Sequence, residues 1–297
     1  MEVDFRTDLA LERTVCPGGL GAGVTVQTCM DAGAEITWVH IETTEAAKRL
    51  GKPVGTYWTL KHPALPEMLP DDRLEIARQI SQTLRMMLPP QGDILVLGLG
   101  NRRMTADALG DRVISGILVT RHLERKEDLR GVCALSPGVL GVTGVETAEF
   151  TRGLVDRLKP AAVLVVDALA AMESNHIGTI VQLTDTGIHP GSGVGNHRKG
   201  ITKETMHVPV IAMGIPMVVY ASTIVRDAIR FLIAAEKPSE ESDVLAEHLA
   251  SQMQGDYVVT PRNIDELVAG LADMLALAVN SALQPSYAIE ELANYLH

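Results

Sequence analysis

Two aspartates in this sequence occupy positions where a carboxyl group can do chemistry. Asp167 directly follows the apolar run Ala161–Val166 (AAVLVV), and Asp107 follows the run Asp93–Leu99 (DILVLGL) and a short loop. In open α/β sheets, ligands bind at the carboxyl ends of the strands. We therefore expect both carboxyl groups at one edge of a sheet.

The surroundings of the two aspartates differ. Thr105 is a suitable N-cap, so a helix N-terminus should keep Asp107 ionised, whereas apolar neighbours should favour the protonated form of Asp167. Such a pair can divide peptide hydrolysis: one carboxylate removes a proton from water, and the neutral partner polarises the carbonyl group. The simpler alternative for Asp107 is an ordinary residue of a helix N-terminus. For Asp167, the alternative is a structural carboxyl group without a catalytic role, which needs an ionic or hydrogen-bonding partner to offset the cost of burial.

A long glycine-rich segment, Asp185–Lys199 (DTGIHPGSGVGNHRK), also attracts attention. Glycines allow backbone N–H groups to approach a substrate closely, although a long structural loop has the same composition. Its histidines, His189 and His197, are possible general bases or metal ligands, but surface histidines without either role are commoner. The turn Gly98–Asn101 (GLGN) resembles half of a dinucleotide fingerprint and lacks its third glycine. The residues that we expect to bind substrate are Gly98, Gly100, Asn101, His189, Gly191, Gly193 and Asn196.

Several other kinds of site lack support in the sequence. No GxSxG or HExxH motif occurs, and the three cysteines form no CxxC pair, so we expect buried free thiols. The net charge of −11 argues against direct binding to a nucleic-acid backbone. No run of 18 apolar residues and no signal-peptide pattern is present, so we expect an intracellular protein that does not span a membrane.

The periodicity of apolar residues predicts the elements that position these groups. We expect residues 1–30 to be irregular, and the polar stretch Glu236–Asp243 to form an exposed loop. Strands are predicted at Ala34–Ile41, Tyr57–Leu60, Asp93–Leu99, Val132–Leu135, Ala161–Val166, Ile177–Leu183, Val208–Gly214 and Met217–Tyr220. Helices are predicted at Asp71–Leu88, Thr105–Thr120, Glu146–Leu158, Thr223–Ala234, Asn263–Asn280 and Ile289–Tyr295. Alternating buried strands and helices indicate a parallel or mostly parallel sheet covered on both faces, without a domain boundary.

These segments together resemble the germination proteases of spore-forming bacteria over nearly the whole chain. The resemblance is carried by Arg6–Ala10 (RTDLA), Gly98–Asn101, Thr105–Gly110 (TADALG), Thr120–Leu123 (TRHL), Ser136–Thr147 (SPGVLGVTGVET), Val166–Ala171 (VDALAA) and, most specifically, the loop Asp185–Lys199. It implies an α/β three-layer sandwich around a twisted, mostly parallel sheet, similar to hydrogenase maturation proteases. It also implies an aspartic endopeptidase without a cofactor, whose two essential aspartates are Asp107 and Asp167.

The resemblance further implies a biological setting. The substrates would be the small acid-soluble proteins that coat spore DNA, and the enzyme would act in the cytoplasm of the forespore and spore core. Members of the family are made as zymogens, remove a short propeptide by self-cleavage and form homotetramers. Because Arg6–Ala10 resembles the processing site, we expect a cut between Asp8 and Leu9. This leaves a propeptide of residues 1–8 and a single peptidase domain of residues 9–297.

One departure from the family pattern and two alternatives stay open. Met172 stands where an arginine is expected after the second aspartate motif, which leaves the electrostatics of the site undecided. The first alternative keeps the fold but makes the chain a metal-dependent maturation-type protease, with Asp107, Asp167 and His189 as nickel or zinc ligands. The second is a non-catalytic binder of a small molecule or nucleotide at Gly98–Asn101.

Overall fold

The computed structural model describes residues 7–14, 21–123, 129–191, 198–234 and 257–294. Within these ranges, nine strands form one sheet in the order β1-β2-β3-β7-β8-β6-β4-β5, with β9 beside β8. The strands are β1 (Val24–Asp31), β2 (Ala34–Ile41), β3 (Gly55–Lys61), β4 (Ile94–Gly98), β5 (Val132–Leu135), β6 (Ala162–Ala171), β7 (Ile180–Thr184), β8 (Val210–Tyr220) and β9 (Val258–Val259).

The sheet is mixed. Strands β8, β6, β4 and β5 are parallel neighbours, whereas β1, β2, β3, β7 and β8 pair antiparallel in succession. The expected mostly parallel sheet therefore describes only its four-stranded part. The two-residue connection Ala32–Gly33 between β1 and β2 permits only antiparallel pairing, because parallel strands need a long crossover.

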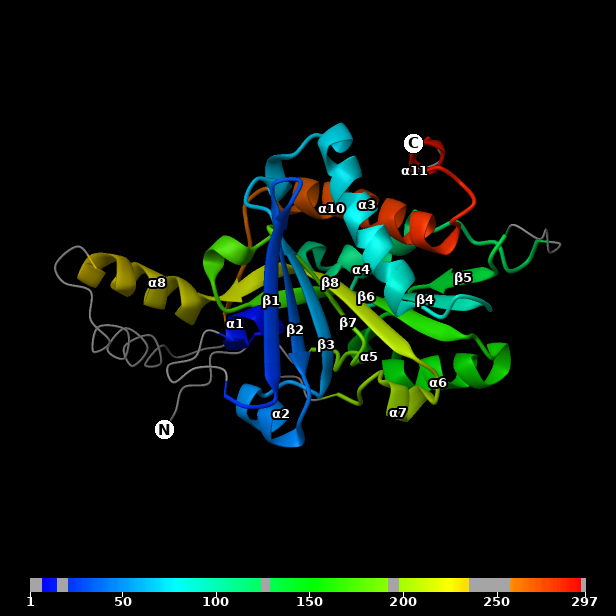
Figure 1. Cartoon of the computed structure of the whole chain (residues 1–297), viewed down its shortest axis with the longest axis horizontal. Helices are drawn as coiled ribbons and strands as arrows, with labels where there is room; N and C mark the ends of the chain where they lie inside the picture. The colour runs from blue at the N-terminus through cyan, green and yellow to red at the C-terminus, as the bar shows by residue number, and fades with distance from the viewer. Residues whose placement is uncertain (1–6, 15–20, 124–128, 192–197, 235–256, 295–297) are drawn as a thin grey trace.

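Helices cover both faces of the sheet, which confirms the expected α/β sandwich (Figure 1). One face packs against α3 (Pro70–Met87), α4 (Leu109–Ser115) and α10 (Ile264–Leu283). The other face packs against α1 (Ala10–Thr14), α2 (Thr44–Leu50), α6 (Thr147–Leu158) and α7 (Lys203–Met206). The remaining helices are α5 (Leu140–Thr143), α8 (Ala221–Ala234) and α11 (Ile289–Ala293).

Helix α10 is long and apolar enough to cross a membrane by length and composition. Its 18-residue apolar window is, however, 78% buried inside the fold. It packs against α3 and α4, and nearly every residue from Leu271 to Leu283 is buried. Helix α10 is therefore a core helix of the α/β sandwich.

Four expectations are corrected by the structure. The segment 1–30 contains α1 and β1, which were predicted to be irregular. The two strands expected at 208–220 are one strand, β8, in which Pro216 lies at a bulge against β6. The helix expected at 105–120 is the short 3-10 turn Thr105–Asp107 followed by α4. Cys29, expected to be buried, is exposed because it lies on the edge strand β1.

Candidate active site

Asp167 lies within β6, beside the carboxyl end of β4. Gly98, the last residue of β4, pairs in parallel with Val166 of β6. Side chains alternate along a strand, so Asp167 points to the same face as Val165 and Leu169. Asp167 is only 7% exposed. A carboxyl group is thus held inside the sandwich at the edge where parallel strands end.

Asp107 reaches this edge through a tight turn. It ends the 3-10 turn Thr105–Asp107, and its Oδ2 accepts a hydrogen bond from the backbone N–H of Asn101 at 2.8 Å. Gly100 has φ 103°, and a Cβ atom there would lie 1.9 Å from the carbonyl oxygen of Asp107. Only glycine therefore lets the loop after β4 fold back onto the residue that carries the carboxyl group.

Gly98 has a similar packing role. A Cβ atom on Gly98 would lie 2.2 Å from the carbonyl oxygen of Gly110, at the start of α4. A Cβ atom on Gly110 would in turn lie 2.6 Å from the carbonyl oxygen of Val166. Gly98 and Gly110, which flank Asp107 in the sequence, therefore bring α4, β4 and β6 into close contact. Substrate contact by Gly98, Gly100 and Asn101 stays a prediction.

The two aspartates interact electrostatically. Burial raises the pKa of Asp167 well above its ordinary value, and the negative charges of Asp107 and Asp8 raise it further. Burial also raises the pKa of Asp107, although the hydrogen bond from the backbone of Asn101 and the positive charge of Arg198 oppose the shift. Asp167 is thus the better proton carrier, as expected. Asp107 is harder to ionise than expected, because burial outweighs the stabilisation that its surroundings offer.

An open cavity of about 720 Å³ is lined by residues of β6, β7, β8, the N-terminal segment and the glycine-rich loop. Neither aspartate is among its lining residues, but Leu169, two positions after Asp167 on the same face of β6, lines it. The loop is closed at its base by two hydrogen bonds between the backbones of Ile188 and Ile201. His189 and Arg198 line the cavity, and Gly191 has φ 73°. Two of the predicted substrate-binding residues, Gly193 and Asn196, and also His197, lie outside the described residues.

The N-terminal segment occupies part of the same cavity. Thr7 and Asp8 line it, and Asp8 is bound to β6 through two hydrogen bonds with the backbone of Ala170. Its N–H donates to the carbonyl oxygen of Ala170, and its Oδ2 accepts from the N–H of Ala170, both at 2.9 Å. The next residue, Leu9, is fully buried. The predicted processing site, the Asp8–Leu9 bond, is therefore anchored to β6 at the border of the cavity.

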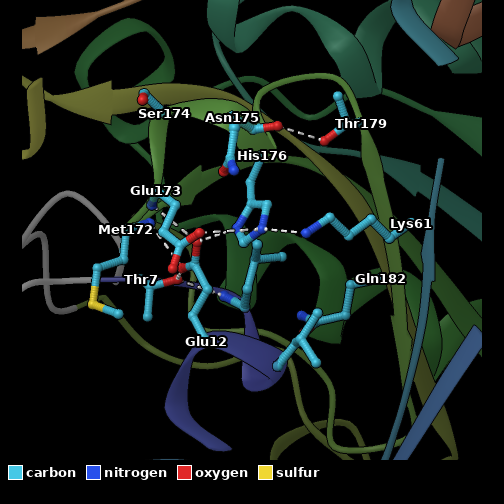
Figure 2. Close-up of polar contacts among 12 residues, drawn as sticks. Thr7, Glu12, Lys61, Met172, Glu173, Ser174, Asn175, His176, Thr179 and Gln182 are labelled. Carbon is cyan, nitrogen blue, oxygen red and sulfur yellow. Dashed lines mark hydrogen bonds and ion pairs between the residues drawn. The ribbon is translucent and has the colours of Figure 1, made fainter. Parts of the chain in front are cut away.

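A buried polar network holds the chain just beyond this bond (Figure 2). Glu12 of α1 accepts hydrogen bonds from the hydroxyl of Thr7, from the backbone N–H groups of Met172 and Glu173, and from Nδ1 of His176 at 2.7 Å. His176 Nε2 lies 3.1 Å from Nζ of Lys61. The Glu12 side chain has no exposed surface. The network thus holds the N-terminal segment at Thr7, before the Asp8–Leu9 bond, and at Glu12, after it.

Met172, the departure from the family pattern, lies away from the aspartates. It follows β6 five residues after Asp167, roughly 16 Å along an extended strand. A side chain there does not reach the carboxyl pair. Arg198 supplies a positive charge near Asp107 instead.

Sequence reasoning missed Lys52, Gln182 and Arg198, which line the cavity together with the predicted residues. Gln182 carried a usable signal, because it is a polar residue inside the otherwise apolar strand Ile180–Leu183. No described group of three His, Cys, Asp or Glu side chains is arranged to hold a metal ion. His189 therefore does not join Asp107 and Asp167 in a ligand set of the kind that the metal alternative requires.

Comparisons with known proteins agree with one another. A family model described as "Germination protease" matches residues 20–250. A germination protease of Caldanaerobacter subterraneus subsp. tengcongensis is 41% identical, covering 99% of this chain and 98% of that protein. Those of Clostridium acetobutylicum and Bacillus pumilus are 36% and 31% identical, covering 98% and 99% of this chain and 99% and 97% of their own lengths. A [NiFe] hydrogenase maturation protease, HycI from Thermococcus kodakarensis KOD1, aligns with 65% of this chain and 98% of its own, with 19% identity and a TM-score of 0.31.

Proposed function

Because this chain belongs to the germination protease family, we propose that it is an aspartic endopeptidase that starts the degradation of small acid-soluble spore proteins. The main observation behind this proposal is that Asp167 interacts electrostatically with Asp107 and with Asp8, and Asp8 lines the cavity as part of a peptide segment of this chain. A spore protein would enter the same cavity in an extended conformation.

The proposed chemistry divides two roles between the aspartates. Ionised Asp107 takes a proton from water while the water oxygen bonds to the carbonyl carbon, and protonated Asp167 donates a hydrogen bond to the carbonyl oxygen. The C–N bond then breaks as the leaving nitrogen takes up a proton. The raised pKa of Asp167 supports its role as the neutral partner. The backbone hydrogen bond from Asn101 supports Asp107 as the ionised one.

We also propose that the chain is a self-processing zymogen. The propeptide is residues 1–8, and residues 9–297 form a single peptidase domain. The position of Asp8 at the cavity, within electrostatic reach of Asp167, supports a cut at this bond. It also suggests how the propeptide inhibits: Thr7 and Asp8 occupy space that a substrate needs. The exposed apolar surface of α8 supports a homotetramer. The proposed location is the cytoplasm of the forespore and spore core.

Cleavage of a purified small acid-soluble spore protein, followed by intact mass, tests the proposed function. The parent chain is expected to release its first eight residues and then to cut the spore protein into discrete fragments. Asp167→Asn and Asp107→Asn should each slow both reactions by about 10²–10⁴-fold, as expected for the loss of a general acid or base. The control is Asp265→Asn, an exposed position in the first turn of α10.

The same experiment separates the alternatives. Full activity after exhaustive chelation supports the aspartic mechanism, whereas loss of activity that zinc or nickel restores would favour the metal-dependent protease. Stabilisation by a nucleotide in a thermal-shift screen, without any cleavage, would favour the binding protein. Equal cleavage by the parent and Asp167→Asn chains would rule out the proposed role of Asp167.

A further inference from the structure

The carbonyl oxygen of Asp8 accepts hydrogen bonds from two side chains that are distant in the sequence. Lys52 Nζ donates at 2.9 Å and Gln182 Nε2 at 3.0 Å. We propose that Lys52 and Gln182 are catalytic residues that polarise the carbonyl group of the bond to be cut. The proposal rests on the proposed function, which places the cut between Asp8 and Leu9.

Both residues bind backbone groups of the segment. Gln182 also accepts a hydrogen bond from the N–H of Ala10 at 2.7 Å, so its amide group spans both peptide bonds of Leu9. Lys52 also donates to the carbonyl oxygen of Thr7 at 3.1 Å. Because every peptide offers the same backbone groups, a protein substrate in this position would meet the same two donors.

The register of the segment is fixed independently of these donors. Ala170 binds both the N–H and the carboxylate of Asp8. The side chain of Leu9 is fully buried in an apolar cluster with Leu169, Ala171, Ile180 and Val219. A shift by one residue would remove Leu9 from this cluster and put in its place either the charged Asp8, which is costly to bury, or the smaller Ala10, which fills less of the space. The carbonyl group of Asp8 is therefore held in one place, facing the two donors.

The chemistry requires such donors. When water adds to the carbonyl carbon, the carbonyl oxygen gains a negative charge, which must be stabilised until the C–N bond breaks. A charge-assisted hydrogen bond from an ammonium group is well suited to this task, and the amide of Gln182 adds a second, neutral donor. Asp167 lies close enough to Asp8 for their charges to interact. The two donors and Asp167 therefore act on the same residue, Asp8.

The fold places each donor on a rigid element. Gln182 lies in β7, between β3 and β8, and is 6% exposed. Lys52 directly follows the C-cap Gly51 of α2, and its own N–H bonds to the carbonyl oxygen of Ala47. Donors that are held in position before the reaction lose little energy in reorganisation.

A different role would be mere anchoring of the N-terminal segment, and two measurements on the full-length chain separate the roles. Self-processing is followed by intact mass in Lys52→Met, Lys52→Arg and Gln182→Glu, with the exposed Lys48→Met of α2 as the matched control. Docking is followed by hydrogen–deuterium exchange of peptides covering residues 7–14, with each substitution combined with Asp167→Asn so that no cleavage occurs. Gln182→Glu keeps an oxygen for the N–H of Ala10 and removes the donor to Asp8.

We expect Lys52→Met and Gln182→Glu to slow cleavage between Asp8 and Leu9 by about 10²–10³-fold, the usual effect of losing one such donor. Docking should be retained, and Lys52→Arg should recover part of the rate. Unchanged cleavage in both variants would refute the proposal while leaving the proposed function intact. Loss of protection together with activity would assign the two residues to anchoring instead. Failure of the parent chain to cut at this bond, or cutting by Asp167→Asn, would contradict the proposed function itself.

Discussion

Burial of the Asp167 carboxyl group lowers the stability of the folded state at neutral pH, a cost that its proposed catalytic role would explain. Removal from water and the nearby charges of Asp107 and Asp8 raise its pKa, so ionising this group costs more in the folded chain than in the unfolded chain. Because protonation and folding are linked, a group whose pKa is higher in the folded state contributes most to the free energy of unfolding when the pH is below its unfolded pKa. That stability is lost as the pH rises towards the folded pKa.

Asp167→Asn should therefore stabilise the protein at neutral pH while abolishing its activity. The gain is about 1.4 kcal/mol for each pH unit that the solution lies above the unfolded pKa, up to the folded pKa. It should shrink as the pH falls towards 4, where both states of the parent carry the proton. Thermal unfolding of the two uncleaved chains between pH 4 and pH 8 measures the difference, with the exposed Asp31→Asn as control. A lower midpoint for Asp167→Asn throughout this range would contradict the argument.

Part of this site is predictable from the sequence. Asp107 and Asp167 follow apolar runs, and an ionisable group at the end of a buried strand indicates either pairing or function. Lys52 gave no such signal, because a lysine after a short helix resembles any surface lysine. Its contact with Asp8 depends on how α2 is placed against β6 and β7. That placement is a tertiary property that no local pattern of residues encodes.

At the scale of elements, the C-terminal turn of α2 controls where Lys52 points. Gly51 ends this helix in the left-handed conformation, with φ 65°, and its N–H bonds to the carbonyl oxygen of Ala47. No atom lies within 4 Å of the position that a Cβ atom would take, so a substitution meets no steric clash. The free-energy cost of Gly51→Ala therefore comes only from forcing an alanine into the left-handed backbone conformation.

We expect Gly51→Ala to lower the free energy of unfolding by about 1 kcal/mol and to slow self-processing, because the turn that orients Lys52 is strained. Urea unfolding and intact mass measure the two effects. The control is Gly153→Ala in the middle of α6, which also has open space around it but ordinary helical geometry. That change should stabilise the chain by up to about 1 kcal/mol without affecting the processing rate. Equal stability effects of the two changes would contradict the assigned role of the turn.

The elements themselves were predictable to different degrees. Strands β2 and β5 have the predicted bounds, because their apolar residues and flanking turns are unambiguous. Strand β1 was missed, although Val24 and Val26 alternate with polar residues and Ala32–Gly33 forms a tight hairpin turn with φ values of 45° and 80°. Strand β8 was divided in two because Pro216 normally interrupts a central strand. Here a bulge in the pairing with β6 accommodates the proline.

At the scale of the whole molecule, the mixed sheet explains how distant segments form one site. The parallel strands β4 and β6 bring Asp107 and Asp167 to a common edge, and the antiparallel strand β7 adds Gln182 from the other side of β8. The N-terminal segment then crosses β6 at Ala170. The expected parallel or mostly parallel sheet did not specify that β7 would pair antiparallel with β8 and so bring Gln182 to this site. The position of Lys52 and of the N-terminal segment at the cavity is therefore the part that the sequence pattern could not reveal.

The surface of the molecule has a second feature that belongs to this scale. Helix α8 projects from the sheet beyond β8 (Figure 1). Phe231 and Leu232 on this helix are 78% and 68% exposed, and the nearby strand β9 adds the exposed Val258. Large apolar side chains grouped in this way commonly mark a surface that is covered by another subunit.

We therefore expect Phe231→Glu combined with Leu232→Glu to dissociate the proposed homotetramer, because two charges would have to be buried at the subunit interface. Size-exclusion chromatography with light scattering should show a mass below that of four chains for the variant and four chains for the parent. The matched control is Phe150→Glu on α6, where a phenylalanine is 42% exposed at a distance from α8. Since α8 lies away from Asp107 and Asp167, the dissociated variant should keep its carboxyl pair and still process itself. A tetramer that survives both charges would place the interface elsewhere, whereas a monomeric parent would remove the tetramer from the proposal.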